Sequence, residues 1–279
     1  MAGAQELKLL GWWAPGVSPF VLRAQMALAI KGLSYEYLPE DRGCKSDLLI
    51  ASNPVYKKVP VLIHDGRPVC ESLLILEYLD DAVGLAGNGK PILPADPYSR
   101  AVARFWAAYV NDKITSRCAW SYISVSTKVL VTSRNFKISH GYHVFPCPSL
   151  FPSCIGSLKT TKQEERAGKV EETLSGLRHL EGVLAECSKG EVEAPFFGGD
   201  SIGFLDIALG CYLPWFEAVG RLAGLGPLID PARTPKLAAW AERFRVAEPV
   251  KALLPGVDEL EEYITTVLYP KWNVAVTGN

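Results

Sequence analysis

The stretch LKLLGWWAPGVSPFVLRAQMALAIKG, residues 7–32, decides the fold of this chain and holds its first candidate functional group. Its apolar start, residues 7–10, predicts a β-strand. Farther on, Ser18 stands directly before Pro19, the order expected of a helix N-cap followed by proline at the first helical position. The helix is expected to end at the lysine-glycine pair that closes the stretch. A hydroxyl at a helix N-terminus lies in positive potential among unpaired N–H groups, so Ser18 is well placed to hold an anion.

Residues 35–80 continue the alternation of strands and helices. Their patterns predict a strand, a short helix, a hairpin with an Asp-Gly turn and a further helix, at residues 35–38, 46–51, 61–70 and 72–80. With residues 7–32, the predicted order is β-α-β-α-β-β-α. Two motifs stand at the junctions: Lys57-Lys58-Val59-Pro60-Val61 before the hairpin, and Glu71-Ser72 before the last helix. Together with Ser18 they indicate a site for a small anionic molecule.

The composition is typical of a globular protein and argues against nucleic acid and membranes as partners. The 279 residues suggest about two domains. A net charge of −1 and the lack of a basic stripe give no support for nucleic acid as a partner. No secretory signal pattern and no apolar run near the roughly 20 residues that span a bilayer are present, so we expect a cytoplasmic protein with no membrane partner. The seven cysteines contain no C-x-x-C pair and are interpreted as free thiols, with Cys70 and Cys211 serving packing.

A second, all-helical part is predicted after residues 84–96, where glycine, asparagine and proline mark a linker. Residues 1–83 are thus interpreted as an α/β domain and residues 97–279 as an all-α domain. Apolar residues at steps of three and four predict helices over residues 97–119, 163–187, 203–218, 235–245 and 257–267. Gly203 stands at the N-cap position of the third of these, and glycine is tolerated at an N-cap at small cost.

Residues 125–156 interrupt the helical pattern and are interpreted as an atypical insertion. A structureless loop of this length is uncommon inside a compact bundle. We favour an in-frame retained intron, because Val125-Ser126 can be encoded by a 5′ splice consensus and the Phe/Pro/Ser/Leu/Cys run before Gly156 by a pyrimidine-rich tract and acceptor. A genuine surface insertion stays open. A metal site in this stretch would need His140, His143, Cys147 and Cys154, whose spacing matches no familiar zinc finger, so no metal is expected.

The chain resembles the glutathione transferases, and within them the plant tau class. The first matching motifs are Leu9-Leu10-Gly11-Trp12, Ser18-Pro19-Phe20-Val21-Leu22-Arg23, and Ala51-Ser52-Asn53-Pro54 with Lys57-Lys58-Val59-Pro60-Val61-Leu62. Further matches are Glu71-Ser72 with Glu77-Tyr78, Ala101 with Arg104-Phe105-Trp106-Ala107, and Phe196-Phe197-Gly198-Gly199-Asp200. Each motif alone is weak, but their order and spacing make the resemblance specific. It covers nearly the whole chain except residues 125–156 and the last ten or so.

The resemblance implies a glutathione transferase fold: a thioredoxin-like α/β domain that binds glutathione, followed by an all-α domain that shapes an electrophile pocket. It also implies a homodimeric enzyme of detoxification and stress response. The reaction it implies is conjugation of glutathione, the co-substrate, to hydrophobic electrophiles. Carried over by position, Ser18 is the catalytic hydroxyl and Pro60 is a cis-proline. The implied glutathione contacts are Lys45, Lys58, Val59, Glu71 and Ser72.

Elementary chemistry supports these roles beside the resemblance. A free thiol with a pKa of about 8.5 is only a few per cent thiolate at pH 7, and a hydroxyl at a helix N-terminus favours the anionic sulfur. Glu71-Ser72 offers a carboxylate for an ammonium group and a helix N-terminus for a carboxylate, which suits a γ-glutamyl group. The plainer alternatives are that Ser18 and Glu71-Ser72 only cap their helices, that Pro60 is an ordinary trans proline, and that both lysines are surface residues.

The electrophile pocket is expected to be apolar and lined from both domains. Its aromatic candidates are Phe20, Trp13, Trp106, Tyr109 and Trp215, although aromatic residues at helical spacing also serve as core. One departure from related tau chains bears on this pocket. Ala14-Pro15-Gly16-Val17 lengthens the step from tryptophan to Ser18 and could shift the hydroxyl.

Three function classes are consistent with this pattern. The first is a glutathione-conjugating enzyme. The second is a non-catalytic, ligandin-like protein that binds glutathione and apolar ligands, with activity impaired by the insertion. The third is a thiol-disulfide exchanger or dehydroascorbate reductase of the same fold, which needs a cysteine where Ser18 stands and is therefore disfavoured.

Overall fold

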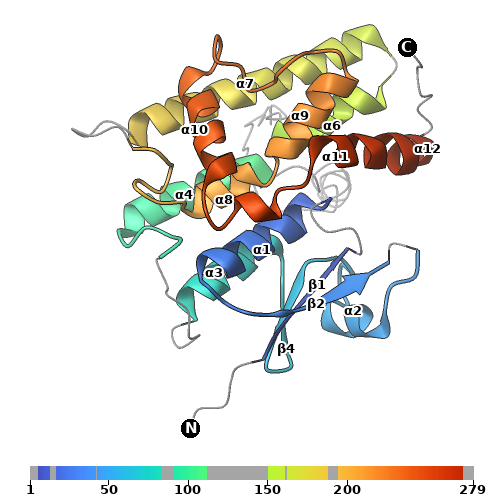
Figure 1. Ribbon diagram of the computed structural model, residues 1–279, viewed down its shortest axis with the longest axis vertical. Helices are drawn as coiled ribbons and strands as arrows, with labels where there is room; N and C mark the ends of the chain where they lie inside the picture. The colour runs from blue at the N-terminus through green and yellow to red at the C-terminus, as the bar shows by residue number, and fades with distance from the viewer. Residues whose placement is uncertain are drawn as a thin grey trace, which may run out of the picture.

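The computed structural model describes residues 6–12, 17–41, 43–82, 91–111, 150–160, 162–187 and 194–272. Figure 1 shows a small sheet with its helices at the N-terminal end of the chain and a larger group of helices on one side of it. The predicted fold class, an α/β thioredoxin-like part followed by an all-helical part, is confirmed.

Four strands form one mixed sheet in the order β2-β1-β3-β4. The central strand β1 (Leu7–Trp12) pairs in parallel with β2 (Glu36–Glu40) and antiparallel with β3 (Val61–His64), which pairs antiparallel with β4 (Arg67–Cys70). The parallel pair requires a crossover connection, which α1 (Pro19–Ile30) supplies. The predicted Asp65-Gly66 hairpin turn is confirmed, since both residues have positive φ, 47° and 78°.

Two further helices, α2 (Asp47–Ser52) and α3 (Ser72–Asp81), complete the N-terminal part. Ser18 caps α1 as predicted, because its Oγ accepts a hydrogen bond from the N–H of Val21 at 3.4 Å. Ser46 caps α2 in the same way, through the N–H of Leu49 at 3.0 Å. Helices α1 and α3 pack on each other between the sheet and the helical part (Figure 1). The capped end of α1 therefore belongs to a helix that meets both parts of the molecule.

The described helical part contains α4 (Pro97–Asn111), α6 (Leu150–Lys159), α7 (Gln163–Cys187), α8 (Phe204–Gly210), α9 (Leu213–Leu222), α10 (Pro235–Val246), α11 (Val257–Tyr263) and α12 (Tyr269–Trp272). A 3₁₀ turn, Lys251–Leu253, precedes α11, and a π-helical turn, Ile264–Leu268, joins α11 to α12. The helices predicted over residues 163–187 and 235–245 are confirmed as α7 and α10. Within the described ranges, no helix is long and apolar enough to cross a bilayer.

The single helix predicted over residues 203–218 is wrong, because α8 and α9 divide it. The break falls at Cys211 and Tyr212, and Pro214 lies in the first turn of α9. Proline lacks the N–H that a continuous helix needs, and its ring clashes with the carbonyl of the residue four positions earlier. The apolar period runs through the break and therefore did not reveal it.

The prediction that residues 125–156 interrupt the helical pattern is wrong at its end, because α6 begins at Leu150. Residues 125–149 lie outside the described part of the chain. In α6, Ser153 and Cys154 are 3% and 1% exposed, and the Ser153 hydroxyl donates to Glu172 on α7 at 2.6 Å. These short side chains let α6 pack closely on α7. Pro152 and Gly156 are poor helix formers, and serine does not contribute to an apolar period, so the sequence pattern does not predict this helix.

The buried carboxylate of Asp206 holds the start of α8. Its oxygens accept hydrogen bonds from the backbone N–H groups of Phe197, Gly198 and Gly203 at 2.8–2.9 Å, and from the Trp240 indole at 2.7 Å. Burial raises the pKa of Asp206 to about 6, although these four donors act in the opposite direction. Gly203 is the N-cap, and a Cβ there would lie 2.9 Å from the Cα of Gly198, so glycine suits this close approach.

A buried ion pair between the C-cap of α1 and α3 also holds the segment that leads into the helical part. The Lys31 ammonium lies 2.6 Å from Oδ1 of Asp80, and the two side chains are 7% and 3% exposed. The Asp80 carboxylate also accepts the N–H groups of Ile92 and Leu93, which lead into the helical part. Burial acts to raise the pKa of Asp80, but the Ile92 N–H and the Lys31 ammonium outweigh it and hold the pKa below its usual value.

We expect Asp80→Asn to lower the free energy of unfolding at pH 7 by about 3–5 kcal/mol, because it leaves Lys31 buried without a carboxylate. The Asp80 pKa falls on folding, so its stabilisation is present above the ordinary carboxyl pKa of about 4 and is lost as the pH falls through the folded value. Urea unfolding of both proteins at pH 7 and pH 3 measures this. The exposed neighbour offers a control, Asp81→Asn, and an equal deficit for Asp80→Asn at both pH values would contradict the account.

Candidate active site

A cavity of about 550 Å³ opens beside the N-terminus of α1, between the two parts of the molecule. The N-terminal part lines it with Trp12, Val17, Ser18, Pro19, Phe20, Lys45, Lys57, Lys58 and Val59. The helical part lines it with Ile155, Trp215, Leu268 and Trp272. Its size is that of ordinary small-molecule sites. The structure thus brings Ser18 together with five other predicted site residues: Phe20, Lys45, Lys58, Val59 and Trp215.

One wall of this cavity is cationic. Lys45, Lys57 and Lys58 line it, and no carboxylate is among its described lining residues. The partial positive charge of the α1 N-terminus adds to theirs. The cavity therefore favours an anionic ligand near the Ser18 hydroxyl.

A buried asparagine shapes the turn that carries two of these lysines. The Asn53 side-chain amide donates to the carbonyl of Lys58 at 3.0 Å, and its oxygen accepts the N–H of Tyr56 at 3.1 Å. Lys57 adopts a positive φ of 52° in this turn. The predicted cis peptide between Val59 and Pro60 is present. Sequence reasoning missed Lys57 as a lining residue, although it lies beside Lys58 in the motif.

The opposite wall is apolar and comes from four helical elements. Ile155 belongs to α6, Trp215 to α9, Leu268 to the π-helical turn and Trp272 to α12. Trp215 was predicted, whereas the other three were not. No motif marks these three residues, because they meet only where separate helices converge.

Two hydrogen bonds hold the ends of the segment that precedes Ser18. The Tyr37 hydroxyl donates to the carbonyl of Trp12 at 2.5 Å, and the Trp215 indole N–H donates to the carbonyl of Val17 at 3.1 Å. Burial, together with the nearby Tyr35, raises the pKa of Tyr37 to about 12, so it stays a neutral donor. Trp13, a predicted pocket residue, lies outside the described part of the chain. The lengthened segment is therefore anchored on both sides of its undescribed residues, and Ser18 keeps its capping position.

Glu71 and Ser72 do not line this cavity in the described structure. Glu71 is exposed and holds a positive φ of 72° at the start of α3, a conformation that non-glycine residues rarely adopt. Ser72 is buried, and its hydroxyl accepts a hydrogen bond from Arg23 at 2.9 Å. Both residues stand at the N-terminus of α3, as the sequence indicates.

Arg23 is fully buried, and the sequence motif that contains it does not predict a role for it. Besides Ser72, its guanidinium donates to Asn111, to the carbonyl of Ala208 and to the hydroxyl of Tyr212 at 3.0–3.2 Å. These partners come from both parts of the molecule. The only local signal was a cation on the otherwise apolar face of α1.

Trp106 and Tyr109 lie elsewhere, which corrects the prediction that they line the electrophile pocket. Trp106 lines a separate cavity between α4, α7 and the turn before α8. The Tyr109 hydroxyl lies 3.0 Å from Nδ1 of His179 on α7. Helical spacing identifies residues that share a face of α4, but it does not tell which neighbour that face meets.

Comparison with known proteins identifies the family. The family description "Glutathione S-transferase, N-terminal domain" matches residues 6–81, and "Glutathione S-transferase, C-terminal domain" matches residues 163–243. A probable glutathione S-transferase, GSTU6, of Oryza sativa subsp. japonica is 46% identical over 99% of this chain and 99% of its own. Glutathione S-transferase U17 of Arabidopsis thaliana is 40% identical over 96% of this chain and 98% of its own. The chain therefore belongs to the glutathione S-transferase family.

Solved structures narrow this to a class. The tau class glutathione S-transferase MiGSTU from mango, Mangifera indica, matches with 37% identity and a TM-score of 0.74, covering 94% of this chain and 98% of its own. Rice GST1 (OsGSTU1), solved in complex with glutathione, matches with 37% identity and a TM-score of 0.72, covering 98% and 100%. Within the family, the chain is a member of the tau class.

We expect Trp215→Phe to lower the free energy of unfolding by about 1 kcal/mol beyond the effect of its smaller aromatic ring, because the donor to the Val17 carbonyl is lost. Urea unfolding measures the change. Trp272→Phe is the matched control, since it makes the same ring change in the same cavity at a different wall. A loss as large in the control would show that ring volume, rather than the hydrogen bond, accounts for the effect.

Proposed function

We propose that this protein conjugates the thiolate of glutathione to hydrophobic electrophiles. The observation that carries the proposal is the position of Ser18, which caps α1 inside a cavity with a cationic wall and an apolar wall. The cationic wall would attract an anionic thiolate, and the apolar wall would bind an apolar electrophile. The family membership of the chain supports this reaction, and the relative OsGSTU1 is described in complex with glutathione.

Ser18 would activate the sulfur without attacking anything itself. Its oxygen already accepts the N–H of Val21, so its own proton is available to donate to a sulfur atom. A shift of the thiol pKa from about 8.5 to about 6.5 needs roughly 2.7 kcal/mol of preference for the anion. A hydroxyl donor together with a helix N-terminus is a suitable source. The thiol proton leaves to water, the sulfur bonds to the electrophilic carbon, and the leaving group departs with its bonding electrons.

The same proposal assigns roles to the residues that would hold glutathione. Lys45 and Lys58 would pair with its glycyl carboxylate, and the backbone of Val59 before cis Pro60 would pair with its peptide groups. Glu71 and Ser72 would receive the γ-glutamyl end at the N-terminus of α3. Phe20 and Trp215 would contact the electrophile from opposite parts of the molecule.

For Ser18→Ala, we expect conjugation of glutathione to 1-chloro-2,4-dinitrobenzene to fall about 50-fold at pH 6.5, because a thiol pKa raised from about 6.5 to about 8.5 lowers the thiolate fraction from about one half to about 1%. The rate should recover at high pH, where the thiol ionises unaided. Ser18→Thr keeps both the hydroxyl and the cap and is the control. The pH profile of kcat/KM for the three proteins is the measurement.

Two results would decide against this reading. Full activity of Ser18→Ala across the pH range would remove the hydroxyl from the mechanism. A folded wild-type protein that binds glutathione without turnover would favour the ligandin-like binding protein instead.

We further propose that the protein is a homodimer that works in the cytoplasm in detoxification and stress response. Leu74 on α3 and Phe105 on α4 are 56% and 62% exposed, and the Arg104–Glu77 ion pair at 2.5 Å joins the same two helices. Large apolar side chains exposed on two helices that an ion pair connects are consistent with an interface. A second copy of the chain would cover them.

The double variant Leu74→Asp/Phe105→Asp should shift the protein from dimer to monomer, because carboxylates would then be buried at the interface. Size-exclusion chromatography with light scattering gives the mass. Val246→Asp is the matched control, since Val246 is 70% exposed on α10. A double variant that stays dimeric would place the interface elsewhere.

The domain division stays part of the proposal: residues 1–83, a linker at 84–96, and a helical domain at 97–279 with an insertion at about 125–156. The retained-intron hypothesis and the genuine surface insertion remain the two explanations for that stretch. Either explanation has to account for helix α6, because this helix begins at Leu150 and packs on α7. The genomic sequence at the codons for residues 125 and 156 decides, and a lack of splice signals there would end the intron hypothesis.

A further inference from the structure

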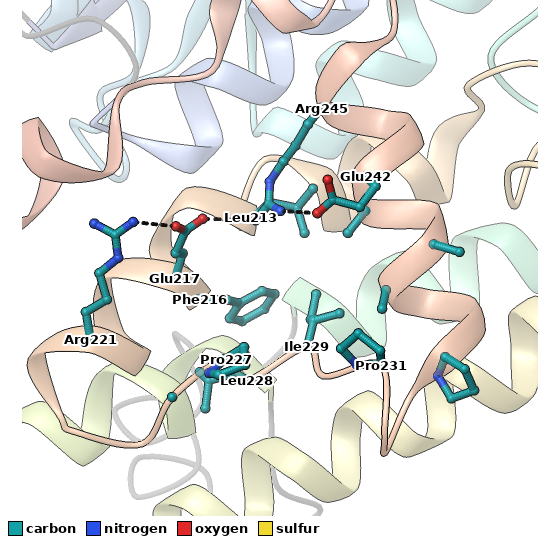
Figure 2. A pocket seen from close by; sticks show the side chains of 15 residues that line it. Leu213, Phe216, Glu217, Arg221, Pro227, Leu228, Ile229, Pro231, Glu242 and Arg245 are labelled. Carbon is teal, nitrogen blue, oxygen red and sulfur yellow. Dashed lines mark hydrogen bonds and ion pairs between the residues drawn. The ribbon is translucent and has the colours of Figure 1, made fainter.

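A second cavity, of about 660 Å³, lies between α9 and α10, and none of its lining residues belongs to the candidate active site (Figure 2). Its floor is formed by Leu213 and Phe216 of α9 and by Leu228, which are only 1–4% exposed. Helix α9 separates the two cavities, because Leu213 and Phe216 face this one while Trp215 faces the other. The volume lies within the range of small-molecule sites.

The wall opposite α10 is held in shape without a ligand. It is the connection from α9 to α10, in which Pro227 and Pro231 have restricted backbones. The connection lies directly on α9, since a Cβ on Gly220 would come within 2.3 Å of the carbonyl oxygen of Gly226. A hydrogen bond within the connection also stabilises its shape: the Arg233 guanidinium donates to the carbonyl of Pro227 at 2.8 Å. A ligand would therefore enter a preformed cavity and spend little free energy on ordering it.

One edge of the cavity is charged, and each of its charges is paired; outside the lining, Arg221 also pairs with Asp258 at 3.0 Å and Glu261 at 3.6 Å. Glu217 lies between Arg221, at 2.7 Å, and Arg245, at 3.2 Å, and Arg245 also pairs with Glu242 at 2.9 Å (Figure 2). These two carboxylates and two guanidiniums are the ionised side chains among the described lining residues. A charged ligand would have to break one of these pairs, whereas a neutral polar group can share their hydrogen-bonding atoms.

We propose that this cavity binds an uncharged, mainly apolar small molecule that carries a ring system and one hydroxyl, amine or carbonyl group. Phe216 and the proline rings offer flat apolar faces, and the charged edge offers a hydrogen bond to the polar end. Because the site lies across α9 from Ser18, such a molecule is held as a second ligand beside glutathione. This inference goes beyond the proposed conjugation reaction.

The test uses the neutral fluorescent probe N-phenyl-1-naphthylamine with the full-length protein. Saturating S-hexylglutathione blocks the candidate active site during the titration. We expect one probe molecule per chain to remain bound. Ala238→Trp and Ala239→Trp, which place an indole in the cavity from α10, should each weaken binding at least tenfold. The matched controls Ala238→Ser and Ala239→Ser should bind as wild type does.

The charge of the ligand is tested separately with anionic 8-anilinonaphthalene-1-sulfonate. It should bind the wild-type cavity more weakly than the neutral probe. Glu217→Gln removes one negative charge that pairs with Arg221 and Arg245. This variant should therefore bind the anionic probe more tightly than the neutral probe.

Several outcomes would overturn the inference. Loss of the neutral probe on adding S-hexylglutathione would place it in the active site, and unchanged binding in both tryptophan variants would place it elsewhere. Tighter binding of the anionic probe at the tryptophan-sensitive site of the wild type would make the ligand class wrong. Near-ultraviolet circular dichroism checks folding, and the exposed position of Ala239 lets that variant carry the test if Ala238→Trp does not fold. The tryptophan variants test the cavity whether or not glutathione binds.

Discussion

The burial of Arg23 is the constraint on which the rest of the structure depends. Its side chain is 0% exposed. Its two terminal nitrogens donate to Ser72, Asn111, Ala208 and Tyr212, whereas its Nε has no hydrogen-bond partner among the described residues. A buried cation is costly unless most of its donors are paired, so α1, α3, α4 and α8 pack productively only when these acceptors converge. This convergence sets the N-terminus of α1 against the helical part. The cavity beside that end exists because the two parts meet there.

The chemistry of the site follows from this meeting of two unlike surfaces. The sheet part contributes the hydroxyl and the lysines, and the helical part contributes aliphatic side chains and indoles. Neither surface alone suits a reaction between an anion and an apolar molecule. Helix α9 serves both cavities, since Trp215 binds the Val17 carbonyl on one side while Phe216 lies in the floor of the second cavity. A single helix thereby connects the position of Ser18 to a surface remote from it.

Much of the fold could be predicted because its signals are local. The cap at Ser18, the Asp-Gly hairpin turn and the period of α7 each involve residues within a few positions of one another. Local signals gave wrong helix boundaries at two places. Pro214 split a helix that the apolar period joined, and the small residues of α6 concealed a helix inside a presumed insertion.

The sequence by itself determined the order of strands and helices, the helix N-terminus that presents Ser18, the lysine-rich turn before Pro60 and the resemblance to a family that the comparisons confirmed. Only the tertiary structure decided which side chains share the cavity: it brought in Lys57, Ile155, Leu268 and Trp272, and it turned Trp106 and Tyr109 away. The physical reason is range. Capping and periodicity act over about four residues, whereas the hydrogen bond from Trp215 to Val17 joins residues 198 positions apart.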